Sequence, residues 1–140
     1  MNFLYPTRTK KGGLAMMAQR RFPNSVMLVA GPDAGEIPES LGGELIAASP
    51  TCIAIGAASE MDGATTVEIA RSSNHCGRDG FMQAFTGEIA VLDSELCVLD
   101  IELNVVLTMP VSANRLKLSV FVNHRSEPSQ ILIEFSECES

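Results

Sequence analysis

Alternating apolar and polar residues predict β-strands in the last third of the chain. Apolar side chains occupy every second position from Leu99 to Met109, and the same alternation recurs over residues 116–122 and 131–135. This period places one strand face against a core and the other in water, whereas a helix would turn Asp100 and Glu102 toward the core. The pattern therefore predicts three strands in an antiparallel meander.

The first half of the chain predicts shorter strands separated by turns. Strand candidates are the apolar runs at 26–30, 44–48, 51–57 and 65–69, together with an alternation at 88–91. The glycines and prolines between residues 31 and 43 predict a surface loop. Asp62-Gly63 is typical of a hairpin turn. Pro50 excludes a continuous central strand and predicts either a bulge or a strand that crosses between sheets.

These elements predict an all-β fold. Seven or eight short strands without a long helix are typical of two packed antiparallel sheets, so we expect an antiparallel β-sandwich. The alternative is a partly open β-barrel, which the same strands would form if one sheet closed on itself.

Charge divides the chain into two parts. Residues 1–22 carry five basic and no acidic residues, whereas residues 23–140 carry five basic and all seventeen acidic residues, a formal charge of −12. We expect a flexible basic arm over residues 1–22 and a single β-sandwich domain over residues 23–140. Either Met16 or Met17 as the natural start would delete most of this positive charge, and the sequence leaves this open.

Composition argues against several functional classes. The net charge of −7 argues against a nucleic-acid binder, whose affinity would come mainly from basic residues that neutralise phosphates. No stretch of the sequence approaches the length of about 18 apolar residues that a membrane-spanning helix needs. The apolar run at 14–18 is too short for an export signal. The sequence therefore predicts a cytoplasmic protein with reduced thiols, in which Cys52 and Cys97 lie in apolar runs as small buried hydrophobes.

Residues 71–80 hold the densest group of reactive side chains, on a predicted loop. Cys76 is a candidate nucleophile whose thiolate Arg78 would favour, with His124 as the distant base. A plain polar turn with solvated arginines explains the same residues. The candidate binding residues of this loop are Arg71, Asn74, His75, Arg78 and Asp79.

No cofactor or metal is predicted. The chain has no phosphate-binding glycine loop, dinucleotide fingerprint, zinc-protease, nucleophile-elbow or calcium-loop motif. His75, Cys76, His124 and one carboxylate would be an acceptable zinc ligand set, but their spacing provides no geometry for one.

An acidic surface is the remaining signal. The alternation would place most acidic residues of the last third on wet strand faces or at strand ends, namely Glu95, Asp100, Glu102, Glu127, Glu134, Glu137 and Glu139. Such charge keeps a β-protein soluble, or it steers a basic partner. We therefore expect a non-enzymatic acidic binding domain for a protein partner, such as an inhibitor, immunity factor or adaptor, or for a second copy through a sheet edge. The alternatives are a small-molecule binding module and a thiol-dependent enzyme using Cys76 and His124.

Overall fold

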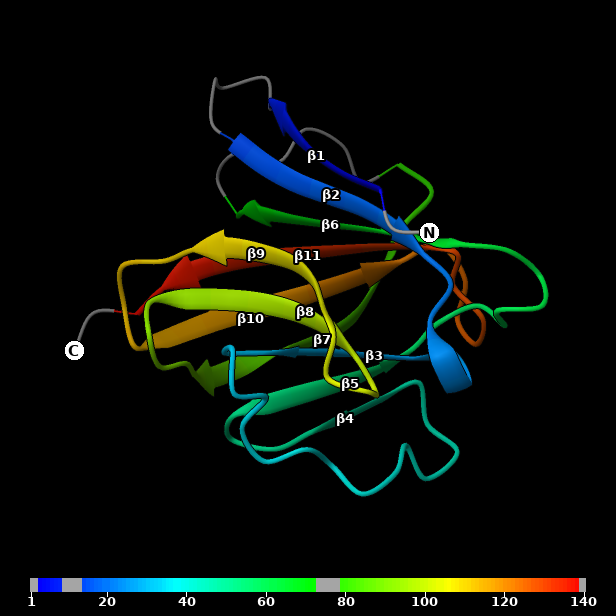
Figure 1. Cartoon of the computed structure of the whole chain (residues 1–140), viewed down its shortest axis with the longest axis horizontal. Helices are drawn as coiled ribbons and strands as arrows, with labels where there is room; N and C mark the ends of the chain where they lie inside the picture. The colour runs from blue at the N-terminus through cyan, green and yellow to red at the C-terminus, as the bar shows by residue number, and fades with distance from the viewer. Residues whose placement is uncertain (1–2, 9–13, 73–78, 139–140) are drawn as a thin grey trace.

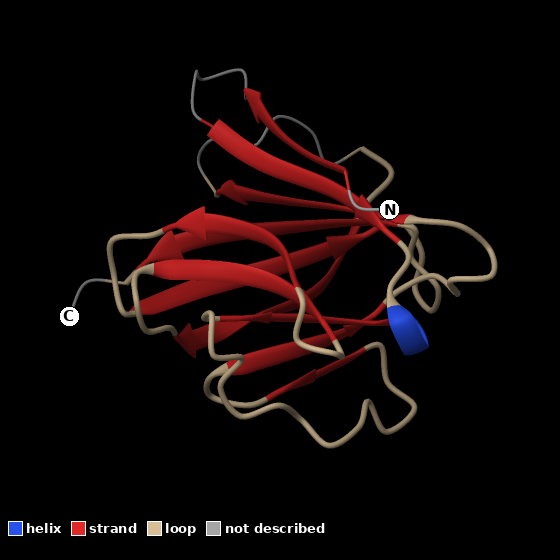
Figure 2. Cartoon of the chain, in the orientation of Figure 1, coloured by secondary structure: helices blue, strands red, loops and turns tan. Residues whose placement is uncertain are grey.

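The computed structural model describes residues 3–8, 14–72 and 79–138. These residues are nearly all strand or loop, with one short helical turn, η1 (Pro23–Ser25) (Figure 2). The strands are β1 (Phe3–Arg8), β2 (Leu14–Arg20), β3 (Val26–Ala30), β4 (Ile46–Ala48), β5 (Cys52–Gly56), β6 (Thr65–Arg71), β7 (Met82–Ala90), β8 (Glu95–Asp100), β9 (Val105–Pro110), β10 (Arg115–Val122) and β11 (Gln130–Glu137).

The strands form two packed sheets (Figure 1). The six-stranded sheet has the order β1-β2-β6-β11-β10-β7, and the five-stranded sheet has the order β4-β5-β3-β8-β9. The predicted β-sandwich is confirmed, and the alternative of a partly open barrel is not observed. The described residues hold more strands than the seven or eight predicted, and one pair, β6 with β11, is parallel.

The predicted strand from Leu99 to Met109 is wrong. The alternation is interrupted by a tight turn at residues 101–104, so its two halves are β8 and β9 of one hairpin. Leu103 lies in this turn with a φ of +67° and is 49% exposed, although the pattern assigned it to the core face. Periodicity cannot distinguish a long strand from two strands whose turn preserves the alternation.

Three predicted connections also differ. The meander is correct for β10 and β11, but β9 belongs to the other sheet. Pro50 lies in the turn of a hairpin between β4 and β5 rather than at a bulge or a crossing between sheets. Asp62-Gly63 lies in a loop that connects β5 to β6 of the opposite sheet, so it makes no hairpin. Turn-forming residues located these connections, but they did not identify which sheet the next strand joins.

Two strands, β1 and β2, fall within the expected flexible arm over residues 1–22, and both belong to the six-stranded sheet. β2 pairs with β6 inside the six-stranded sheet, and Ala15, Ala18 and Phe22 are buried. The domain therefore includes residues that precede position 23. The basic residues at the end of β2 favoured the prediction of a flexible arm. In the structure, Arg20 instead pairs with the buried carboxylate of Asp100.

The core fills the space between the sheets and extends to a second layer. Met27 and Val29 of β3 face the main core, whereas Leu28 and Ala30 join an apolar cluster on the other face of the five-stranded sheet. Both faces of β3 are thus buried, which explains its continuous apolar run. Residues 31–45 supply Leu41 to this outer cluster.

Two cysteines are buried among apolar residues, as predicted, and the structure places them in the outer cluster. Cys52 and Cys97 are buried free thiols, and burial raises the pKa of Cys52 to about 11. Neither thiol is therefore an activated nucleophile. Within the described ranges, no helix is long and apolar enough to cross a bilayer.

Candidate functional site

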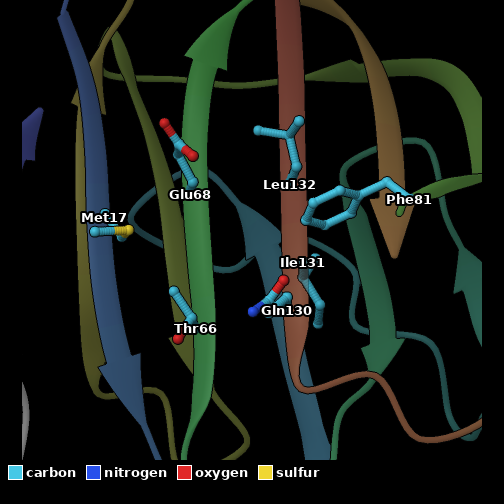
Figure 3. Close-up of a pocket in the computed structure, with 7 residues that line it drawn as sticks. All are labelled: Met17, Thr66, Glu68, Phe81, Gln130, Ile131 and Leu132. Atoms are coloured by element: carbon cyan, nitrogen blue, oxygen red, sulfur yellow. The ribbon is translucent and has the colours of Figure 1, made fainter. Parts of the chain in front are cut away.

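A pocket of about 230 Å³ lies over β2, β6 and β11 of the six-stranded sheet (Figure 3). The strand register builds it, because Met17 pairs with Glu68, which in turn pairs with Leu132. Phe81, just before β7, forms the opposite wall beside Ile131 and Leu132. The pocket is lined by Met17, Thr66, Glu68, Phe81, Gln130, Ile131 and Leu132.

This pocket is small, and most of the residues that line it are uncharged. Glu68 is the one ionisable residue among the described residues of the lining, and the Thr66 hydroxyl accepts a hydrogen bond from Gln19 Nε2 at 3.2 Å. A single carboxylate provides no acid–base pair. The volume also falls below the about 300–1,000 Å³ typical of small-molecule sites.

A second pocket, of about 300 Å³, lies where several loops meet at one end of the sandwich. The N-terminal ends of β3 and β11 and the C-terminal end of β5 all point to this end. Glu44, Arg125 and Glu127 bring charges of both signs to the lining. This pocket combines residues from the connections around positions 24, 43, 57 and 126.

Arg71 has a structural partner rather than a free guanidinium. Its two Nη atoms donate to the Glu137 carboxylate, and its guanidinium carbon lies 5.1 Å from the centre of the Phe135 ring. Ser112 donates to the same carboxylate through its main-chain N–H at 2.7 Å and through its hydroxyl. This network fastens the end of β6 to β11 and to the β9–β10 connection.

His124 lies at the opposite end of the sheet from Arg71. β10 ends just before His124, whereas β6 runs the other way along the sheet and ends at Arg71. The Nδ1 atom of His124 accepts main-chain hydrogen bonds from Ser126 at 3.2 Å and Glu127 at 3.0 Å, so the ring organises its own loop. Asp79 is exposed, three residues before β7 begins.

The remaining members of the reactive loop lie outside the described residues. These are Asn74, His75, Cys76 and Arg78. The nucleophile and zinc hypotheses therefore stay predictions. Among the residues that the structure describes, no group of three or more potential metal ligands is found.

The predicted acidic surface is partly wrong. Glu102 and Glu127 are exposed and Glu95 is half-buried, but Asp100 and Glu134 are buried and Glu137 is half-buried in its pair with Arg71. Glu139 lies outside the described residues. The prediction failed for Asp100 because β8 ends there and the carboxylate is buried, where it accepts hydrogen bonds from the following turn.

Asp100 is the structural carboxylate that sequence reasoning missed. Its Oδ1 accepts main-chain hydrogen bonds from Glu102 and Asn104, both at 2.9 Å, and its Oδ2 accepts from Asn104 Nδ2 at 3.1 Å and from Arg20. The carboxylate thus holds the β8–β9 turn and ties it to β2 of the other sheet. The signal was the Asp-x-x-x-Asn spacing, which suits side-chain-capped turns.

An acidic loop over residues 31–45 was also missed as a functional feature. All four of its charged residues, Asp33, Glu36, Glu39 and Glu44, are exposed and acidic. The loop is held in place, since the Glu36 N–H donates to the Thr51 hydroxyl at 2.7 Å and the Ser49 hydroxyl donates to the Glu36 carbonyl at 2.5 Å. A fixed, one-sign surface of this kind can steer an oppositely charged partner.

Comparison with known proteins identifies the fold. The crystal structure of ComJ from Bacillus subtilis, described as an inhibitor of the DNA-degrading activity of NucA, matches with a TM-score of 0.63. The match covers 97% of this chain and 99% of ComJ at 10% sequence identity. The two chains therefore share a fold. No family model and no curated protein matches the sequence.

Proposed function

We propose that this protein is a non-enzymatic inhibitor module that binds another protein and covers a basic site on it. The observation that carries the proposal is the similarity to ComJ over nearly the whole of both chains. ComJ is thus a precedent for a domain of this size and fold that inhibits another protein.

Charge supports the same proposal. The chain carries −7 overall, and the acidic loop (residues 31–45) presents four exposed carboxylates without a basic residue. Its attachment to Ser49 and Thr51 limits the ordering that binding would require. A nuclease is the partner class that fits best, because an enzyme that binds DNA presents basic groups to phosphates.

The test begins with the full-length protein as bait in extracts of its own cells. A captured protein is then purified, and its enzymatic activity is titrated with this protein at low and high salt. We expect inhibition that weakens as salt rises, because complementary charges are screened.

Two variants with equal charge changes locate the surface. Amides replace the loop carboxylates in one variant: Asp33→Asn, Glu36→Gln, Glu39→Gln and Glu44→Gln. Amides replace exposed carboxylates elsewhere in the control: Glu60→Gln, Asp62→Asn, Asp79→Asn and Glu102→Gln. The proposal predicts that the first variant loses far more affinity than the control. A purified partner whose activity is unchanged by the wild-type protein would refute the inhibitor function.

A further inference from the structure

The sheet edges of this protein are protected unequally. β1 and β7 end the six-stranded sheet, and β4 and β9 end the five-stranded sheet. Proteins usually block such edges with proline, lysine, very short strands or a covering element, because unpaired main-chain groups can bind another chain. β1 contains Pro6, β4 has three residues, and β9 ends at Pro110 and contacts β2.

β7 has the least protection. It has nine residues and contains neither proline nor lysine. A register shift against β10 places a bulge near Ala84, but the stretch from Phe85 to Ala90 pairs regularly with β10. Bulges are one way to blunt an edge, but this bulge lies near one end of β7 and leaves residues 85–90 in regular register.

The main-chain groups that point away from β10 follow from the register. Val91 N–H donates to the Asn114 carbonyl at 2.8 Å, so alternate residues before it turn their main-chain groups outward, beginning with Ala90. Ala90 N–H is used, because it donates to the Pro50 carbonyl at 2.9 Å. The next two outward residues are Thr86 and Glu88, for whose main-chain groups the described part of the chain shows no partner.

Charge indicates which partner suits this edge. Glu88 pairs with Arg115 and lies opposite Lys117 in the register, so the β7 edge carries no excess negative charge. Among the other described residues, exposed carboxylates outnumber exposed basic side chains, and this excess would repel a second copy and attract a basic protein. The neutralised edge is therefore the place where two copies can approach each other with least repulsion.

We propose that two copies of this chain associate by antiparallel pairing of their β7 strands about a twofold axis at Gly87. Thr86 of each copy then exchanges two main-chain hydrogen bonds with Glu88 of the other. The two Gly87 residues meet where the backbones approach most closely, and the Phe85 ring already occupies the space 2.7 Å from where a Gly87 Cβ would lie. A register that placed Glu88 opposite Glu88 would oppose like charges.

Sedimentation of the full-length protein over a wide concentration range tests this pairing. We expect a reversible dimer whose affinity rises with salt, since added ions screen the repulsion between two acidic chains. Thr86→Lys should weaken the dimer by about tenfold or more, because a lysine on the edge disfavours strand pairing. Gln130→Lys is the control, with the same charge change on β11, which has neighbours on both sides.

Amide hydrogen exchange provides a second readout that does not need a variant. The amides of Thr86 and Glu88 should exchange more slowly at high protein concentration, while those of other exposed edges stay unchanged. A protein that is monomeric at every concentration, or a Thr86→Lys variant that dimerises like the wild type, would overturn the pairing. Neither result bears on the inhibitor proposal, which concerns a different surface and predicts the opposite salt dependence.

Discussion

Two arginine–carboxylate pairs fasten distant parts of this fold, and their surroundings differ. Arg20 and Asp100 join β2 of one sheet to the β8–β9 turn of the other, with side-chain exposures of 22% and 0%. Arg71 and Glu137 join β6 to β11 within one sheet, with exposures of 43% and 17%. A guanidinium–carboxylate pair therefore occurs once where the carboxylate is fully buried, which we call the dry junction. It occurs again where both groups are partly exposed, which we call the wet junction.

The difference lies in what remains when the carboxylate is removed. At the dry junction, the fully buried Asp100 carboxylate is the common acceptor of Arg20 and of three donors from Glu102 and Asn104, and its removal would leave all four donors without it. At the wet junction, water can replace Glu137 as the partner of Arg71. Burial and the number of dependent donors, rather than the ion pair itself, set the contribution of each carboxylate to stability.

The largest effect is expected for Asp100→Ala. This change should lower the free energy of unfolding by about 3–5 kcal/mol, because it breaks a buried pair and leaves the turn's donors unsatisfied. Urea denaturation measures the loss. Glu102→Ala removes an exposed carboxylate from the same turn and should stay within about 0.5 kcal/mol of the wild type. Equal losses for the two variants would show that the turn, and not the buried carboxylate, is what the mutations disturb.

Asp100 also shows how far the sequence predicts this fold. The alternation that correctly predicted a β-sandwich also carried the strand through residues 101–104, because Leu103 fell on the apolar positions. Periodicity reports the face on which each side chain lies, but it does not report a turn held by one carboxylate and an arginine eighty positions earlier. The fold class follows from the local alternation of apolar and polar residues. The sheet to which each strand belongs depends on pairing between residues far apart in the sequence.

The candidate site was less predictable than the fold. Arg71 and His124 were grouped by the reactivity of their side chains, but the strand directions place them at opposite ends of the sheet. Each has a local structural task, in the Glu137 network or in its own loop. The acidic loop was visible in the sequence as a polar connection, and only its exposure and attachment to Thr51 distinguish it as a surface.

Glu137→Gln should have a smaller effect than Asp100→Ala. We expect a loss of about 1 kcal/mol, because the amide keeps part of the hydrogen bonding to Arg71 and Ser112 and both partners reach solvent. Thermal or urea unfolding at neutral pH measures it. Arg71→Ala should lose more than Glu137→Gln, since it also removes the contact with the Phe135 ring. A loss at Glu137 as large as that at Asp100 would contradict the role assigned to burial.

Acid titration examines the same wet junction without changing its shape. Hydrogen bonds from Arg71 and then Ser112 lower the pKa of Glu137 to about 2. In the unfolded chain the carboxyl titrates near pH 4.3, so the folded state binds the proton less tightly. Its contribution to stability is fully present above about pH 4.3 and is lost as the pH falls toward 2. The stability difference between wild type and Glu137→Gln should therefore shrink over this range, and a constant difference would contradict the lowered pKa.

The smallest effect is expected at the third pair, Arg115 with Glu88, whose side chains are 65% and 48% exposed. Glu88→Gln should lower the free energy of unfolding by at most about 0.2–1 kcal/mol, and added salt should reduce even this, because water and ions screen an exposed pair. A dilute sample is needed, since β7 pairing between copies would stabilise the wild type by mass action. Double-mutant cycles for all three pairs should then rank the coupling energies in the order of burial. If Arg115 and Glu88 couple as strongly as Arg20 and Asp100, exposure does not govern these pairs, and the contrast between the dry and wet junctions fails.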